Sequence, residues 1–275
     1  MFKAMTVRTM AKKVTRLEML ARRRNDRNTA VLAALAGDPV RFLTDAGMEP
    51  DPWQEGVLRS DASRLLLLAS RQAGKSSVAA ALALQTALLR PHSPVLLLSP
   101  SLRQSGELYR KVVDLFRTLG RPLGVTAESA LRLELANGSR VVSLPGDEKN
   151  IRGFSGVALL VIDEAARVAD SLYYAVRPML AVSRGRLVAL STPFGKRGWY
   201  HDEWHGAGQW QRVQITAEQC RRIAPEFLAE ERRALGERWY RQEYLCSFED
   251  TIDAVFSWAD IQAALSDDVK PLFLE

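Results

Sequence analysis

Short runs of purely apolar residues recur along the chain, and polar residues follow each run at once. Four of these runs are Leu65–Leu68, Val95–Leu98, Ala158–Ile162 and Leu187–Leu190. Segments of helical periodicity separate them, and a strand without polar alternation is typical of a sheet that is covered on both faces. The pattern therefore predicts an α/β fold with a mostly parallel central sheet flanked by helices. In such sheets ligands bind beyond the carboxyl ends of the strands, which is where these polar residues fall.

Helical patterns and one hairpin account for most of the remaining chain. Asn137-Gly138 lies between two β-type runs and predicts a two-residue hairpin turn. The segment from Pro225 to Tyr244 is helical in pattern and highly charged, and it predicts a small C-terminal helical subdomain packed on the sheet. The other expected elements are the helices Thr29–Ala36, Glu55–Ser60, Val78–Leu89 and Gln104–Leu119 and the hairpin strands Leu131–Leu135 and Arg140–Leu144.

The first apolar run leads directly into a glycine-containing loop and an alanine-rich helix. The loop reads Ser70, Arg71, Gln72, Ala73, Gly74, Lys75, Ser76, Ser77. In such a loop the backbone N–H groups and the helix N-terminus face an anion, Lys75 adds a point charge, and the Ser76 hydroxyl can hold Mg²⁺. Ala69 stands where the usual pattern has its first glycine. The order of strand, loop and helix predicts a P-loop site that binds the phosphates of ATP.

The third apolar run ends in two adjacent carboxylates. We expect Asp163 to hold Mg²⁺ through its water shell and Glu164 to polarise the water that attacks the γ-phosphate. Phosphoryl transfer also needs positive charge on the equatorial oxygens. Arg71 lies inside the phosphate loop and can supply that charge within the chain. Arg152, on a loop before the acidic strand, can reach a neighbouring subunit or can be an ordinary surface arginine.

Two further polar pairs stand near the same edge of the predicted sheet. Ser191 and Thr192 end the fourth apolar run, where a hydroxyl pair can sense the γ-phosphate and relay its loss, or can simply cap a turn. Trp53 and Gln54 precede the first core strand, so the ring can stack on adenine while the amide reads its edge. The alternative for Trp53 is a place in the hydrophobic core.

Positive charge is concentrated at the N-terminus. The formal net charge of the chain is +6, yet residues 1–27 alone hold nine basic and two acidic residues. The remainder is therefore close to neutral, and the chain has a basic arm rather than a basic body. Such an arm can contact a phosphate backbone or an acidic partner, or it can be a solvated tail. No apolar run approaches the roughly 20 residues of a membrane span, and two cysteines make no disulfide framework, so a cytosolic protein is expected.

Together these motifs resemble the ATPase domain of the large terminase subunit of tailed bacteriophages, over roughly residues 50–257. The phosphate loop is similar to the family's variant loop, which relaxes the first glycine and includes an arginine. Trp53-Gln54 falls where the family has its adenine motif. The other similar segments are Ser99–Ser101 with Gln104-Ser105, Ile151–Gly153, Val161–Ala166, Ser191–Gly198 and Gln242–Phe248.

The resemblance implies an ATP-driven motor that pushes double-stranded DNA into a procapsid. It implies a homo-oligomeric ring, with the portal protein and the small terminase subunit as partners and no membrane. An arginine from a neighbouring subunit would complete each site, and Arg152 is our candidate. The implied location is the cytoplasm of an infected or lysogenic bacterial host, not the virion. Family members continue into a nuclease domain, whereas this sequence stops at Glu275, so we expect ATPase activity and no nuclease activity.

The expected division of the chain has four parts: a basic arm with a short helix (1–48), a P-loop ATPase core (49–217), a helical lid or linker subdomain (218–257) and a truncated linker (258–275). Two other functions stay open. A helicase-like DNA translocase would share the core, but the residues after about 215 are too few and too helical for a second lobe. A catalytically degenerate structural subunit is disfavoured because Lys75, Ser76, Asp163 and Glu164 are all intact.

Overall fold

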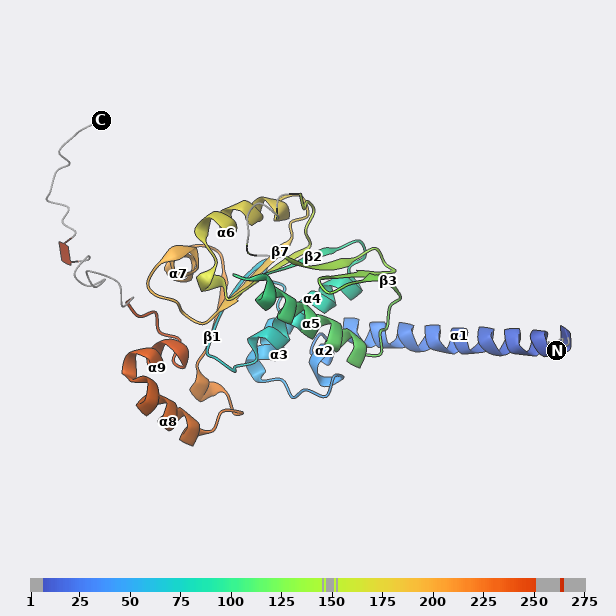
Figure 1. Cartoon of the computed structure of the whole chain (residues 1–275), viewed down its shortest axis with the longest axis horizontal. Helices are drawn as coiled ribbons and strands as arrows, with labels where there is room; N and C mark the ends of the chain where they lie inside the picture. The colour runs from blue at the N-terminus through green and yellow to red at the C-terminus, as the bar shows by residue number, and fades with distance from the viewer. Residues whose placement is uncertain (1–6, 145, 147–150, 152, 251–262, 265–275) are drawn as a thin grey trace, which may run out of the picture.

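An eight-stranded sheet forms the centre of the computed structural model, which describes residues 7–144, 146, 151, 153–250 and 263–264 (Figure 1). The strand order is β3-β4-β5-β2-β6-β7-β1-β8, and all neighbours from β5 to β8 are parallel. Only β3 and β4, at one edge, pair antiparallel. The predicted fold class, a mostly parallel sheet, is therefore confirmed. The strands are β1 (Arg64–Ala69), β2 (Pro94–Leu98), β3 (Val125–Glu128), β4 (Arg132–Leu135), β5 (Arg140–Leu144), β6 (Leu159–Asp163), β7 (Arg186–Ser191) and β8 (Gln211–Ile215).

Helices cover both faces of this sheet, which is why the central strands lack polar alternation. In β1, Leu65 and Leu67 pack against α2, α3, α4 and α5, whereas Leu66 and Leu68 pack against α6 and α7 on the other face. The chain thus builds two hydrophobic layers around one sheet. These helices are α2 (Arg41–Thr44), α3 (Pro52–Arg59), α4 (Lys75–Leu89), α5 (Leu102–Thr118), α6 (Asp170–Val176) and α7 (Gly198–His205).

The largest departure from the predicted elements is at the N-terminus. A single helix, α1 (Val7–Gly37), replaces the expected basic arm and short helix at 29–36, and most of it extends away from the rest of the molecule (Figure 1). The segment contains no proline or internal glycine and is rich in Ala, Arg, Leu and Met, which are good helix formers, so the helix continues through the charged residues. The prediction that this helix starts at Thr29 was wrong.

Two other differences bear on the site. The helix expected from Glu55 begins at Pro52, which is favourable at a first helical position, so Trp53 and Gln54 lie in its first turn rather than in a loop. Strand β8 was not predicted because its sequence, Gln211–Ile215, alternates polar and apolar residues. It pairs parallel with β1 at the edge of the sheet. The predicted hairpin is confirmed by the antiparallel pair β4–β5, whose connection contains Gly138 with φ of 79°.

The helical segment predicted from Pro225 consists of α8 (Pro225–Leu235) and α9 (Glu237–Glu243). Leu228, Tyr240 and Tyr244 form a small apolar cluster there with Ala217. The backbone of this unit meets the phosphate loop, because Arg71 N donates to Glu243 O over 3.2 Å. The unit is therefore placed to respond to what the loop binds. In the described part of the chain, no helix combines the length and the apolar character that a bilayer crossing requires.

Candidate functional site

The phosphate loop forms a tight turn between β1 and α4. Gly74 is the N-cap of α4 and has φ of 87°, a left-handed conformation that glycine adopts at little cost. A Cβ at Gly74 would stand 2.7 Å from Nε2 of Gln54, so space as well as conformation requires glycine here. The first N–H groups of a helix have no partner within it. The loop thus presents unpaired donors and the positive end of α4 to an anion.

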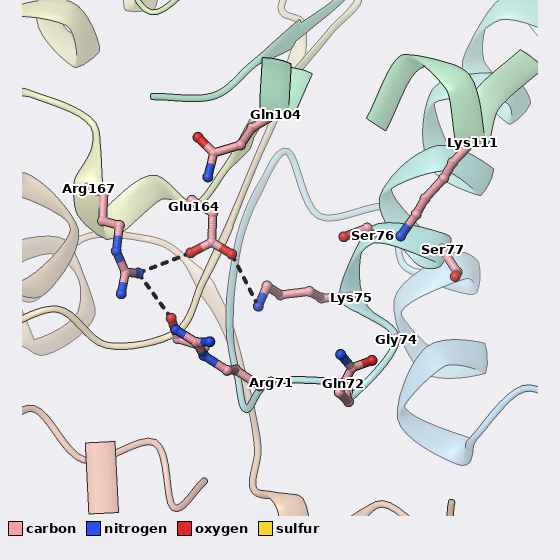
Figure 2. A pocket seen from close by; sticks show the side chains of 11 residues that line it. Arg71, Gln72, Gly74, Lys75, Ser76, Ser77, Gln104, Lys111, Glu164 and Arg167 are labelled. Atoms are coloured by element: carbon pink, nitrogen blue, oxygen red, sulfur yellow. Dashed lines mark hydrogen bonds and ion pairs between the residues drawn. The ribbon is translucent and has the colours of Figure 1, made fainter. Parts of the chain in front are cut away.

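A cavity of about 520 Å³ lies in front of this loop (Figure 2). It collects side chains from the loop, from α5 and from the carboxyl ends of β6 and β7. Its lining residues are Arg71, Gln72, Gly74, Lys75, Ser76, Ser77, Gln104, Lys111, Glu164, Arg167 and Thr192. The predicted loop, acidic and hydroxyl motifs therefore meet at one place. Ser70 and Ala73, also predicted to bind phosphate, are buried behind the loop and are not part of the lining.

Glu164 lies between two cations at the centre of this cavity. Its Oε1 is 3.4 Å from Lys75 Nζ, and its Oε2 is 3.0 Å from Nη1 of Arg167 (Figure 2). Lys75 is buried, whereas Glu164 keeps partial exposure toward the cavity. The carboxylate is thus held in place, yet open to a ligand. This agrees with the residue types expected at the reacting end of a nucleotide.

Asp163, the last residue of β6, is buried directly behind Glu164. Its Oδ1 accepts the backbone N–H of Glu164 over 2.9 Å. Burial raises the pKa of Asp163 to about 6, and the negative charge of Glu164 acts in the same direction. A buried carboxylate of this kind is stabilised by a nearby cation.

The two hydroxyls at the end of β7 have different places. Thr192 lines the cavity, and its Oγ1 accepts from Nη1 of Arg167 over 3.1 Å. Ser191 is fully buried, and its Oγ accepts the backbone N–H of Ala166 over 3.1 Å. Thr192 thus joins the side chains at the reacting end, whereas Ser191 ties the end of β7 to the turn after the acidic pair.

Arg71 turns toward the C-terminal helical unit. Its Nε donates to Oε2 of the buried Glu243 over 2.5 Å, and this hydrogen bond raises the pKa of Arg71 above its ordinary value. Arg167 also approaches Glu243, with Nη2 at 3.8 Å from Oε1. One carboxylate from α9 therefore contacts both arginines that border the cavity. Arg152, the other predicted catalytic arginine, lies outside the described residues.

The predicted adenine motif lies beside the phosphate loop but does not line the cavity. Trp53 packs against the apolar residues under β1, and its Nε1 is buried without a partner among the described residues. Oε1 of Gln54 accepts the N–H of Asp51 over 2.8 Å, and Nε2 donates to Gly74 O over 3.5 Å. Gln54 thus supports the loop from behind, and adenine recognition stays a prediction.

Sequence reasoning missed four residues of the site: Gln104, Lys111, Arg167 and Glu243. Gln104 and Lys111 are seven residues apart on α5 and so project from one face of the helix, a spacing that marks this face once its position over the loop is known. Arg167 stands three residues after Glu164, the separation at which side chains meet on a helical turn. Glu243 had no local signal, because its partners are far away in the sequence.

Replacing Asp163 with Asn should change how stability depends on pH. The folded protein keeps the proton on Asp163 up to about pH 6, whereas an unfolded carboxyl releases it near 3.8, so the folded state binds more protons between these values. The free energy of unfolding therefore falls as the pH rises from about 4 to 6, by up to about 3 kcal/mol. We expect Asp163→Asn to flatten this fall and to be the more stable protein at pH 7.

Urea unfolding from pH 4 to pH 7 measures this effect. Asp114→Asn is the matched control, because Asp114 is an exposed carboxylate on α5. A pH dependence that is the same in both variants would contradict the assignment of the titration to Asp163.

The fold and the site define the class of protein. A glycine-capped helix follows β1, a carboxylate pair ends β6, and one strand, β7, lies between them. This is a P-loop type of fold, whose nucleotides bind at the helix N-terminus. A family model described as "Terminase large subunit, T4likevirus-type, N-terminal" matches residues 66–263, well over half of the chain. The chain belongs to this family, and the resemblance derived from its motifs is confirmed.

Individual relatives agree with this assignment. The large terminase subunits of Thermus phage G20c and Thermus virus P23-45 are each 25% identical over 262 residues, covering 80% of this chain and 53% of the relative. The chain thus spans about half the length of these curated relatives. The large terminase ATPase domain of Thermus phage P74-26 shares the fold with a TM-score of 0.67 and 23% identity, over 76% of this chain and 97% of that domain. The large terminase of another thermophilic bacteriophage, in complex with ATP-γ-S, gives 0.57 and 16%, over 72% and 52%.

Proposed function

We propose that this chain is the ATP-hydrolysing motor domain of a viral terminase large subunit and that it powers the movement of double-stranded DNA into a procapsid. The observation that carries this proposal is the convergence of Lys75, Glu164 and Thr192 on one cavity at the N-terminus of α4. Membership of the terminase family supports it. The second of the solved terminases described above, which has the same fold, is known with ADP and with ATP-γ-S, and this supports ATP as the ligand.

The residues present suit Mg²⁺, which prefers oxygen ligands. Asp163 supplies a buried carboxylate whose raised pKa reflects the lack of a strong cationic partner, and Ser76 supplies a hydroxyl at the first turn of α4. These two residues would hold the ion, either directly or through water. When bound, Mg²⁺ would neutralise charge on the phosphate oxygens.

Within the chain, the arriving phosphates compete with Glu164 for Lys75. Lys75 now pairs with Oε1 of Glu164, and a triphosphate would attract the ammonium group more strongly because of its greater negative charge. Glu164 would then be held at Oε2 alone, by Arg167, with its other oxygen free to accept a proton from the attacking water. In this scheme Arg71 and Thr192 border the γ-phosphate, and Trp53 and Gln54 stay our candidates for the adenine side.

The whole motor would be a ring of these chains on the portal protein, with the small terminase subunit as a further partner. We propose that Arg152 of a neighbouring subunit completes each site and that the motor acts in the cytoplasm of the bacterial host. Residues 49–217 would form the ATPase core and residues 218–257 a helical lid, so that hydrolysis and lid movement are coupled through Glu243.

Lys75→Ala tests the site directly. We expect the affinity for ATP with Mg²⁺ to fall at least about tenfold, because a buried ammonium that faces the phosphates is lost. Isothermal titration of the purified chain measures the affinity, and release of inorganic phosphate measures hydrolysis. Lys196→Ala is the control, because Lys196 pairs with Asp250 and does not line the cavity.

Equal affinity of the wild type and Lys75→Ala would contradict the proposed nucleotide site. Tight ATP binding by the wild type without any hydrolysis, even with duplex DNA and at high protein concentration, would instead favour the degenerate structural subunit.

A further inference from the structure

A second cavity, of about 470 Å³, lies at the opposite end of β1 from the phosphate loop. Residues at the N-terminal ends of β1 and β7 and from the 3₁₀ helix η3 (Arg177–Leu180) line it, together with the turn after η3. Three of the lining residues are arginines: Arg64, Arg177 and Arg184. Arg64 is the first residue of β1, and the phosphate loop follows the last one, so the strand separates the two sites by roughly 20 Å. We name this cavity the arginine pocket.

Aromatic rings hold two of these arginines. The guanidinium carbon of Arg64 lies 6.0 Å from the centre of the Trp210 ring, and that of Arg177 lies 5.3 Å from the Tyr173 ring. Both rings are themselves fixed, because the Tyr173 hydroxyl and the Trp210 Nε1 donate to Glu203 over 2.8 and 2.7 Å. Stacking orients a guanidinium group and leaves its N–H donors available for a ligand.

The charge of the arginine pocket is not balanced by the described part of the chain. Among the residues that the structure describes, no carboxylate lines the pocket, and none lies within ion-pair distance of its three arginines. Surface arginines elsewhere, such as Arg59 and Arg232, pair with nearby glutamates. Arg184 also adopts φ of 49°, a left-handed conformation that glycine or asparagine would adopt at lower cost. Neither ion pairing nor turn formation therefore explains why arginine occupies this position.

We propose that the arginine pocket binds phosphates of the backbone of duplex DNA. This inference rests on the proposed function, which supplies DNA as the substrate. Guanidinium groups recognise phosphate oxygens through paired hydrogen bonds, and three of them can contact neighbouring phosphates. Phosphate contacts carry no sequence information, as a motor that moves along any sequence requires. Strand β1 would then join DNA at its N-terminal end to the nucleotide at its C-terminal end.

The double variant Arg177→Ala with Arg184→Ala tests this inference in the full chain. We expect its affinity for a short fluorescein-labelled DNA duplex, measured by anisotropy, to fall at least about tenfold at low salt. The slope of log affinity against log salt should decrease by about 2, one for each lost phosphate contact. ATP hydrolysis without DNA should stay at the wild-type rate, because neither residue touches the phosphate-loop cavity.

Arg41→Ala with Arg59→Ala removes the same charge from exposed arginines that pair with Asp45 and Glu55, and it should bind DNA as the wild type does. Equal DNA affinity and salt slope in both double variants would overturn the arginine pocket as a DNA site and leave the ATPase proposal intact. The same holds if the pocket variant keeps its affinity for DNA but loses affinity for polyglutamate, which would indicate an acidic protein partner. If the wild type neither hydrolyses ATP nor binds DNA, the proposed function fails and this inference fails with it.

Discussion

Glu164→Gln should abolish ATP hydrolysis while ATP still binds. Glutamine has the size and shape of glutamate but cannot take a proton from water, so loss of the general base should lower kcat roughly 10²- to 10⁴-fold. The variant also removes the charge that now holds Lys75 at 3.4 Å and Arg167 at 3.0 Å (Figure 2). Both cations become free for the phosphates, so the affinity for ATP should stay equal or rise.

Steady-state phosphate release gives kcat, and isothermal titration with ATP and Mg²⁺ gives the affinity. Glu107→Gln is the matched control, because Glu107 is exposed on α5 and pairs only with Arg110 at 2.6 Å among the described residues. A kcat near the wild-type value would exclude Glu164 as the base. A large loss of ATP affinity with normal folding would show that Glu164 organises the site rather than activating water.

The buried centre of the fold could be predicted because its signal is local. Strands β1, β2, β6 and β7 are apolar on both faces, and their sequences can hardly form anything else in a protein of this size. Strand β8 escaped prediction because a half-polar pentapeptide becomes a strand only through its pairing with β1. Helix α1 escaped because charge was taken as a sign of a loose arm, although charged residues are good helix formers.

The site divides along the same line. Gly74, Lys75, Ser76 and the acidic pair belong to compact motifs, so the sequence alone brought them to one edge of the sheet. Arg167 has partners on three elements, Glu164, Thr192 and Glu243, and only the tertiary fold brings them together. No spacing rule relates residues that are 25 or 76 positions apart.

Arg167 now explains how the separate motifs can act together. Its guanidinium group contacts the acidic pair through Glu164, the end of β7 through Thr192 and the C-terminal helices through Glu243, and it lies over the ring of Phe194 at 4.6 Å. A change at any one of these partners must therefore redistribute the hydrogen bonds to the others. This makes Arg167 the best candidate in the described part of the chain for coupling hydrolysis to movement of α8 and α9.

Arg167→Ala should accordingly lower kcat by roughly 10²- to 10³-fold, because Glu164 loses the cation that holds it once Lys75 has turned to the phosphates. We expect Arg167→Lys to be nearly as inactive, since a single ammonium group cannot contact three partners and stack on a ring in one geometry. The affinity for ATP should change much less than kcat, because Lys75 and the loop N–H groups stay in place. Phosphate release and isothermal titration measure the two quantities.

Arg197 offers an internal comparison for this prediction. Its guanidinium group also lies over Phe194, at 5.4 Å, but it does not line the cavity. If the packing on Phe194 were the important contribution, Arg197→Ala would lose activity to a similar extent as Arg167→Ala. If Arg167 acts through Glu164 and Thr192, Arg197→Ala should retain activity, and Arg167→Ala combined with Glu164→Gln should be no slower than Glu164→Gln alone, since both changes remove one catalytic function. Additive losses in the double variant would show that Arg167 acts independently of Glu164.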